Sequence, residues 1–376
     1  MPVVTIFIAT KFGAAYEAAE HKGVAHFIEH MLFKGTKKRN SKEISSEIEK
    51  VGGEINAFTS EQMTGYYTKT PRKHFEKGFD VLSDMLYNSI FAKSEIEKER
   101  TVIFEEIKRR HDNPSQYVLS KLKEVLYSAP FGLPRLGTLE TVSKIKRKQI
   151  LDYYNYYSSD SLVIAVVGAA SWESIREVAR SKVKGPGKAH FLAMSPNLQF
   201  NKYLEMRKNL QQAHLALGFH TPTLSLRERY AAEIFDCILG KGMSSRLWQE
   251  IREKRGLAYT VHSYLSQEKS YGYESIYVGT KKEKIKEVKE IIIKQIKSVQ
   301  RIDLKEVEEA KENLIGSHDV ASEKSDEIAM NLLLNEIASS AEEYYRYSER
   351  ISEVKPEDVR KIARIKGYST VTLVPK

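Results

Sequence analysis

The feature that most constrains the fold of this chain is a pattern of two strands followed by a helix, which occurs once in each half of the sequence. Residues 52–70 hold two runs of β-favouring residues around a polar turn, and residues 71–90 then have the apolar spacing of an amphipathic helix. Residues 256–280 repeat the two strands, and a second helical pattern follows them. Its apolar positions are Ile285, Val288, Ile292 and Ile296. A supersecondary unit that recurs in both halves predicts an internal duplication.

Each half also has an apolar strand near its end, at residues 161–168 in the first half and 369–375 in the second. A length of 376 residues is too great for one ordinary core and suits two domains. A segment with glycine, proline and no clear period predicts a linker at 186–198. We therefore predict an α+β fold of two homologous domains, 1–185 and 199–376, each a mostly antiparallel mixed sheet with helices packed on it.

The composition excludes some classes of protein. Apolar residues make up 41% of the chain and charged residues 29%, which is a globular balance. No stretch approaches the roughly 20 apolar residues that span a bilayer, so we expect no membrane partner. Cys237 is the single cysteine, so no internal disulfide can form. Because the apolar start of the chain reads as a strand and has no export signal, we expect a cytoplasmic location.

The net charge of +10 makes a nucleic-acid or acidic partner an alternative to consider. The lysines, however, are mixed with glutamates along predicted helices, as in KKEKIKEVKE, and such mixing is typical of solvated faces. No segment clearly gathers basic and aromatic residues on one face. We therefore expect no nucleic-acid partner, although a steep salt dependence of binding to DNA would favour this alternative.

The sharpest functional pattern is HFIEH at residues 26–30. On a helix, His26 and His30 are four residues apart, so both imidazoles project from one face, as two zinc ligands must. Glu29 borders the same face, and its carboxylate can reach a metal-bound water as a general base. The surrounding residues are apolar nearly all round, so the helix is buried, and buried polar groups are costly unless something satisfies them. The alternative is a pair of helix-surface histidines with an unrelated glutamate.

Catalytic zinc usually has three protein ligands, and the best source of the third is a helix predicted within residues 93–114. Ser94 and Glu97 indicate its start by forming a capping box, and Asn113-Pro114 its end. Glu99 and Glu106 fall on its apolar stripe. Glu106 is therefore preferred as ligand to Glu105, which falls on a solvated stripe, and Glu99 suits a carboxylate that supports the site from outside.

These residues resemble the pitrilysin, insulinase and mitochondrial-processing-peptidase family of zinc metallopeptidases. The resemblance is dense in GVAHFIEHMLFKGT and ERTVIFEEI, resumes in GMSSRLWQEIREKRGLAYTV, and covers both halves of the chain in order. It implies one zinc ion per chain on His26, His30 and Glu106, with Glu29 as base and Glu99 assisting catalysis or metal loading. The order HxxEH is the inverse of the commoner zinc motif.

The resemblance also implies how a peptide is held. A strand from Glu54 to Thr59 would pair with the substrate backbone, and Asn56 and Ala57 match the family's Asn-Ala pair on that strand. Arg252 and Tyr259 match an Arg/Tyr pair that holds the substrate carbonyl, and Tyr259 is counted with Glu29 and Glu99 among the catalytic residues. Without the resemblance, Arg252 would read as a helix-surface arginine and Tyr259 as a core tyrosine.

The implied function is a zinc-dependent endopeptidase that cleaves unfolded peptides or short protein segments inside a closed chamber formed by the two domains. Small members of the family work as dimers, so we expect a homodimer, or a heterodimer with an inactive paralogue. One departure is that family members usually begin with a strand that precedes the segment opening this sequence. We therefore expect either that the first sheet is one strand short or that another element covers its edge. The alternative function is a non-catalytic structural subunit of the same fold, which would usually lose part of the metal set.

Overall fold

A computed structural model describes residues 2–183, 191 and 194–376, and the chain folds into two compact units. The first unit consists of Met1–Lys108, Leu133–Ala193 and Ala321–Glu342. The second consists of Arg109–Gly132, Met194–Val320 and Glu343–Lys376. Of the predicted linker, 186–198, residues 186–190, 192 and 193 lie outside the described residues. Neither unit is continuous in sequence.

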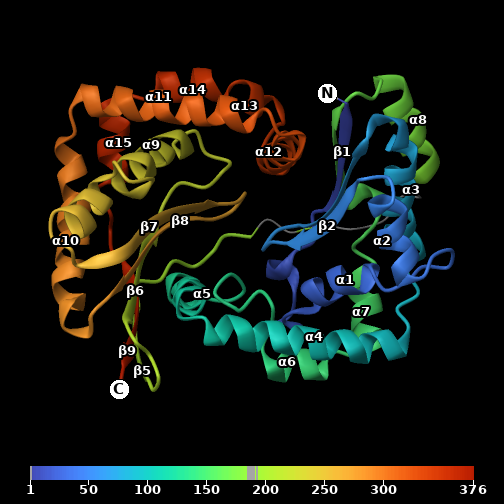
Figure 1. The fold of residues 1–376 in the computed structure, drawn as a ribbon, viewed down its shortest axis with the longest axis horizontal. Coiled ribbons are helices and arrows are strands. Elements are labelled where there is room, and N and C mark those ends of the chain that lie inside the picture. Colours follow the sequence, from blue (N-terminus) through green and yellow to red (C-terminus); the bar gives the residue numbers. More distant parts are fainter. Residues whose placement is uncertain (1, 184–190, 192–193) are drawn as a thin grey trace. The chain divides into compact units, whose positions relative to one another are not determined.

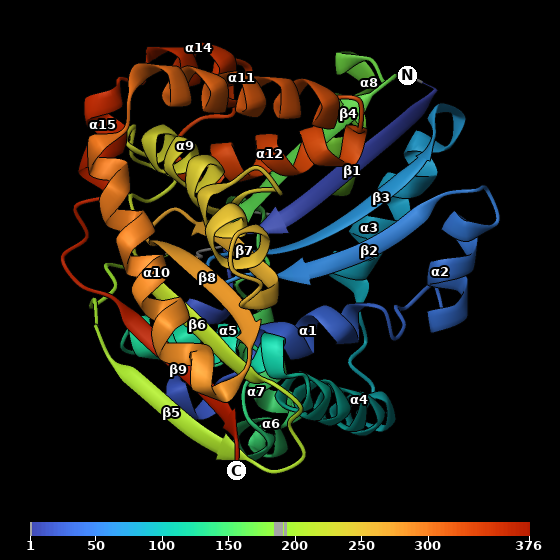
Figure 2. The same cartoon turned by 60° about the vertical axis from the view of Figure 1, so that its left-hand side comes forward.

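The first unit is built on an antiparallel sheet (Figure 1), and its strands follow one another in the order β2-β3-β1-β4 (Figure 2). Its strands are β1 (Val3–Thr10), β2 (Glu54–Thr59), β3 (Thr64–Pro71) and β4 (Leu162–Gly168). The two predicted strands around a polar turn are β2 and β3, and the predicted late strand is β4, so these predictions are confirmed. Within the described residues β2 pairs with β3 alone and forms an edge of the sheet.

Apolar side chains cover both faces of this sheet. Along β1 the residues alternate, so Val4, Ile6 and Ile8 belong to a core with the first unit's helices. Phe7 and Ala9 face the other way and pack against α12 (Ser325–Ala338), which lies along β1 and β4 (Figure 2). A continuous apolar strand is what a sheet covered on both faces requires.

The remaining helices of the first unit surround the core that contains α1. They are α1 (Val24–Leu32), α2 (Ser41–Glu49), α3 (Phe75–Asn88), α4 (Lys93–Asp112), α6 (Leu139–Lys144), α7 (Arg147–Tyr154) and α8 (Trp172–Lys182). The predicted end of α4 is confirmed, since Asn113 caps the next helix and Pro114 opens it. The predicted start is wrong by a residue or two: α4 begins at Lys93, so Ser94 lies inside its first turn.

The second unit repeats the sheet with one strand more, in the order β5-β9-β6-β8-β7. Its strands are β5 (Lys202–Arg207), β6 (Ala213–His220), β7 (Ala258–Gln267), β8 (Gly272–Thr280) and β9 (Ser369–Pro375). Only the pairing of β5 with β9 is parallel, so the sheet is mixed and mostly antiparallel, as predicted. In the described part of the chain, the four strands of the first sheet correspond to β7, β8, β6 and β9, and β5 has no counterpart.

The helices of the second unit come from both halves of the sequence. They are α5 (Pro114–Leu126), α9 (Arg229–Gly240), α10 (Ile285–Ser298), α11 (Leu304–Ala321), α13 (Glu342–Tyr345), α14 (Tyr347–Glu353) and α15 (Pro356–Ile362). The predicted helix after the repeated strands is α10, with Val288, Ile292 and Ile296 buried. α5 packs on β6 and β9. The two halves of the sequence thus exchange helices. Helix α5 comes from the first half and packs on the second sheet, and α12 comes from the second half and packs on the first sheet.

None of the described helices is both long enough and apolar enough to cross a membrane.

Candidate metal centre

The helix α1 carries the HFIEH pattern, and its neighbours explain why it is held in the core. Six of its residues are buried: Val24, Ala25, Phe27, Ile28, Met31 and Leu32. Gly23 opens the helix with a φ of +101°, a conformation that L side chains rarely adopt. His26, Glu29 and His30 are only partly buried and lie on the remaining face of α1. The helix therefore presents its three functional side chains on one side.

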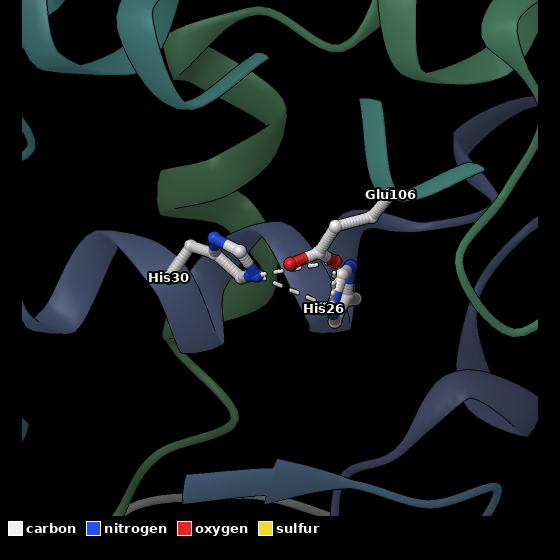
Figure 3. A group of neighbouring side chains, drawn as sticks. All are labelled: His26, His30 and Glu106. Carbon is white, nitrogen blue, oxygen red and sulfur yellow. Dashed lines mark hydrogen bonds and ion pairs between the residues drawn. The ribbon is translucent and has the colours of Figure 1, made fainter. Parts of the chain in front are cut away.

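His26, His30 and Glu106 converge at one point. The Nε2 atoms of His26 and His30 lie 3.3 Å apart, and Oε2 of Glu106 lies 3.4 Å from the former and 3.7 Å from the latter. Figure 3 shows the Glu106 carboxylate reaching from α4 to the two rings of α1. The three ligand atoms all lie within 4.8 Å of one another. Glu106 belongs to the same compact unit as the two histidines.

This donor set fits a zinc ion. Zinc in a catalytic site takes nitrogen and oxygen ligands with bonds of about 2.0–2.2 Å, so two ligands of a tetrahedral ion are roughly 3.3–3.6 Å apart. The separations of 3.3, 3.4 and 3.7 Å are close to that spacing. Three ligands leave one position for water, as catalytic zinc sites require. Glu105, which was not preferred as ligand, has a side chain 66% exposed and pairs with Lys108.

Glu99 lies behind His30. Its Oε2 is 3.0 Å from Nδ1 of His30, and its Oε1 is 2.8 Å from Nζ of Lys34. Burial alone would raise the pKa of Glu99, but the hydrogen bonds with His30 and Lys34 outweigh it and hold that pKa below its usual range. A carboxylate at Nδ1 fixes the ring so that Nε2 is directed at the metal position.

Glu29 lies on the same helix face, and its carboxylate accepts a hydrogen bond from Thr59 Oγ1 at 2.5 Å. Burial raises the pKa of Glu29, and the hydrogen bond from Thr59 and the charges of His30 and Arg135 oppose the rise without cancelling it. A carboxyl group whose pKa is raised by burial is suited to accept a proton. Glu29 is not among the three grouped ligands, in keeping with the role of a base.

The strand β2 carries the two residues expected to hold substrate. Asn56 is exposed and Ala57 is half-buried, and in the sheet they pair with Tyr67 and Tyr66 of β3. Oδ1 of Asn56 accepts a hydrogen bond from the Ala57 N–H at 2.8 Å. An edge strand with backbone groups directed away from its neighbour can pair with an extended peptide.

Arg252 and Tyr259 are brought together in the second unit. The guanidinium carbon of Arg252 lies 4.7 Å from the centroid of the Tyr259 ring and 4.1 Å from that of Trp248. Arg252 lies in a π-helical segment, Trp248–Glu253, and Tyr259 at an irregularity of β7. Tyr259 is 77% exposed, so the alternative interpretation as a core tyrosine is wrong.

Sequence reasoning missed three residues of the site, Lys34, Thr59 and Arg135. Lys34 lies four residues after His30, a spacing that could have suggested a partner for Glu99 on the adjoining helix. Thr59 ends the predicted substrate strand, but nothing local indicates that its hydroxyl meets Glu29. Arg135 lies in a loop that no motif singles out.

Comparison with known proteins gives the same family for both halves of the chain. Residues 1–139 match the family described as Insulinase (Peptidase family M16), and residues 144–314 match the one described as Peptidase M16 inactive domain. An uncharacterized zinc protease of Rickettsia felis is 34% identical over 98% of this chain and 90% of its own length. The uncharacterized zinc protease YmxG of Bacillus subtilis is 37% identical over 84% of this chain and 77% of its own.

A solved structure has the same fold. A protease from Helicobacter pylori superimposes with a TM-score of 0.94, covering 100% of this chain and 94% of its own, at 21% sequence identity. At that identity the likeness concerns the fold alone.

Proposed function

Because this chain belongs to the insulinase family of peptidases, family M16, we propose that it is a zinc-dependent endopeptidase whose metal is held by His26, His30 and Glu106. The observation that carries the proposal is the convergence of these three side chains from two helices. The relatives named zinc proteases support both the metal and the reaction class. When bound, the zinc ion supplies a Lewis acid that polarises a water molecule and the scissile carbonyl.

Glu29 is the proposed general base. Glu29 lies on the same helix face as His26 and His30, and in this role its carboxylate takes the proton of a water molecule at the metal position and passes it to the leaving amine. Thr59 holds the carboxylate in place through a hydrogen bond to Oε2. Burial raises the pKa of Glu29, which makes its carboxylate a stronger base.

The proposed substrate is an unfolded peptide or a short protein segment. Such a chain can pair as an extra strand with β2, and main-chain hydrogen bonds of this kind give binding with little side-chain specificity. Asn56 and Ala57 lie in the middle of that strand. Arg252 and Tyr259 are proposed to hold the carbonyl oxygen of the substrate and to stabilise the negative charge that develops on it. Enclosure in a chamber between the domains would then exclude folded proteins.

A non-catalytic structural subunit is the second candidate. The match of residues 144–314 to a family described as an inactive domain favours it for that part of the chain. The first unit, however, retains both histidines, Glu106 and Glu29, and a subunit without activity has no need of the full set. The proposal of an enzyme is therefore preferred. We also propose that the chain forms a homodimer, which light scattering after size-exclusion chromatography would test.

The deciding experiment is metal analysis combined with an activity assay. The purified chain is expected to contain about one zinc ion per chain and to cleave a denatured peptide. A chelator should remove the ion and the cleavage together, and added zinc should restore both. A chain that holds zinc but cleaves no unstructured peptide would favour the structural subunit, and a chain that holds no zinc would overturn the proposal.

A further inference from the structure

The loop that follows α5 is packed against the start of the metal helix. Gly137 has a φ of +75°, and a Cβ atom there would lie 2.2 Å from the carbonyl oxygen of Lys22. In the other direction, a Cβ atom at Gly23 would lie 2.5 Å from the carbonyl oxygen of Leu136. Only glycine permits so close an approach of two backbones. The hydroxyl of Thr141 adds a hydrogen bond of 2.8 Å to the same Lys22 carbonyl.

Arg135 immediately precedes Leu136 in this loop, so its backbone lies next to the packed residues. The first residue of α1 is Val24, so the contact lies just before the first turn of the helix that carries His26. Arg135 is half-buried. Its positive charge opposes the rise in the pKa of Glu29. The loop therefore carries a positive charge beside the start of the helix that holds the proposed base.

Arg135 lacks the kind of partners that two other arginines of the first unit, Arg39 and Arg100, have. Arg39 is held by Glu47, Asp80 and Asp84, and Arg100 by Glu97 and two backbone carbonyls. Within the part of the chain that the structure describes, the Arg135 side chain makes neither an ion pair nor a hydrogen bond. Glu29 does not fill this role, since its carboxylate accepts from Thr59.

A half-buried guanidinium with no partner has five N–H donors to satisfy, and a planar carboxylate is the group that matches them best. Beside a catalytic site the group that arrives is the substrate. We propose that Arg135 is a specificity-determining residue that binds a carboxylate of the peptide substrate close to the scissile bond. This inference rests on the proposed peptidase function. The carboxylate comes either from an acidic side chain or from the C-terminus of a short peptide.

The experiment measures how a carboxylate changes binding and cleavage. The parent peptide of the series has a known cleavage site and a free C-terminus. It has a Glu residue next to the cleavage site. One partner peptide has Gln in place of that Glu, and the other has an amidated C-terminus. The affinity of each peptide is measured on zinc-loaded Glu29→Gln protein and on the double variant that also carries Arg135→Gln. The kcat/KM of each peptide is measured on the wild type and on the single variant Arg135→Gln.

One of the two exchanges is expected to weaken wild-type binding about tenfold, as the loss of a charge-assisted hydrogen-bonded pair would. The difference between the two peptides should also appear in KM. With Arg135→Gln the two peptides should bind equally well. Arg135→Glu should reverse the preference in favour of a Lys peptide. If the Gln peptide binds more weakly than the parent, Arg135 binds an acidic side chain. If the amidated peptide binds more weakly, Arg135 binds the C-terminal carboxylate.

The matched control is Arg72→Gln. Arg72 is exposed and directly follows the last residue of β3. The first residue of β3, Thr64, pairs with Thr59 near the site, so Arg72 lies at the far end of this strand. This variant should keep the wild-type preference. The proposal is overturned if neither exchange matters in the wild type, or if Arg135→Gln weakens all the peptides equally. A carboxylate preference in binding without any zinc-dependent cleavage would count against the peptidase function and would leave the role of Arg135 in place.

Discussion

Oε2 of Glu99 lies 3.0 Å from Nδ1 of His30, on the side of the imidazole ring opposite the atom that faces Glu106. A buried carboxylate in this position fixes the tautomer and orientation of a ligating histidine. We expect Glu99→Gln to weaken zinc binding about 10–100-fold, because the amide keeps the shape but loses the charge. Competition with a chelator of known affinity measures the effect.

The matched control for this change lies half a turn away. Glu97 is on the same helix, has a side chain 70% exposed and pairs with Arg100. Glu97→Gln should leave the zinc affinity unchanged, since an exposed ion pair contributes little. Equal zinc affinities for Glu99→Gln and the wild type would show that Glu99 does not orient His30.

Glu29→Gln separates metal binding from catalysis. The amide can still accept the hydrogen bond from Thr59, but it cannot take a proton from water. The variant should keep about one zinc ion per chain and lose roughly 10²–10⁴-fold in the rate of peptide cleavage. Metal analysis and a cleavage assay on one preparation decide the matter. Cleavage at the normal rate would mean that another group is the base.

Glu106→Gln tests the third ligand against its neighbour in sequence. Removal of the carboxylate whose Oε2 lies 3.4 Å from Nε2 of His26 should abolish tight zinc binding. Glu105→Gln should retain the ion, because the Glu105 side chain is exposed and pairs with Lys108. Elemental analysis of both purified variants gives the answer. Retention of zinc by the first variant, or its loss from the second, would contradict the assignment.

The local features of the site could be predicted from the sequence. The four-residue spacing of His26 and His30, with apolar residues around them, determines both the helix and the face on which the two rings lie. The stripe of α4 that contains Ile103 also contains Glu99 and Glu106, so a helical period was enough to prefer Glu106. Strand β2 was predicted with the bounds that the structure has.

What could not be predicted depends on contacts between distant segments. An apolar face on α12 predicts that the helix is buried but not where, and it packs on β1, more than 300 residues earlier in the chain. The duplication of the sequence therefore gave no sign that α5 and α12 are exchanged between the sheets. Thr59 and Arg135 were missed for the same reason, since each meets Glu29 only through the folded chain.

Glu274 makes the stability of the second unit depend on pH. It is fully buried on β8, and burial, followed by the charge of Asp236, raises its pKa well above the ordinary value. A group whose pKa is raised by folding contributes stability that is fully present below its unfolded pKa and is lost as the pH rises through its folded pKa. The unfolding free energy of the wild type should therefore fall as the pH rises above the ordinary pKa of a glutamate, 4.5.

Glu274→Gln removes the ionisation but keeps a polar group of the same shape. At about pH 9 the variant should exceed the wild type in unfolding free energy by about 1–3 kcal/mol, and near pH 4 the difference should shrink or reverse. Urea denaturation across this range measures it. Glu283→Gln, at an exposed residue before α10, is the control and should follow the wild type. Parallel pH profiles for Glu274→Gln and the wild type would refute the prediction.

Leu333 tests whether α12 stabilises the sheet of the first unit. It is completely buried, in one cluster with Phe7, Ala9 and Ala165. Leu333→Ala should lower the unfolding free energy of the first unit by about 2–5 kcal/mol, as other cavity-forming changes do. Hydrogen exchange should speed up most in β1 and β4, although the changed residue lies in the second half of the sequence. The control is Leu304→Ala, at a residue of α11 that is 59% exposed.

For the same reason a fragment of residues 1–185, which lacks α12, should expose Phe7 and Ala9 and should not fold by itself. A fragment with the exchange protection of the full chain would show that the sheet does not need this helix.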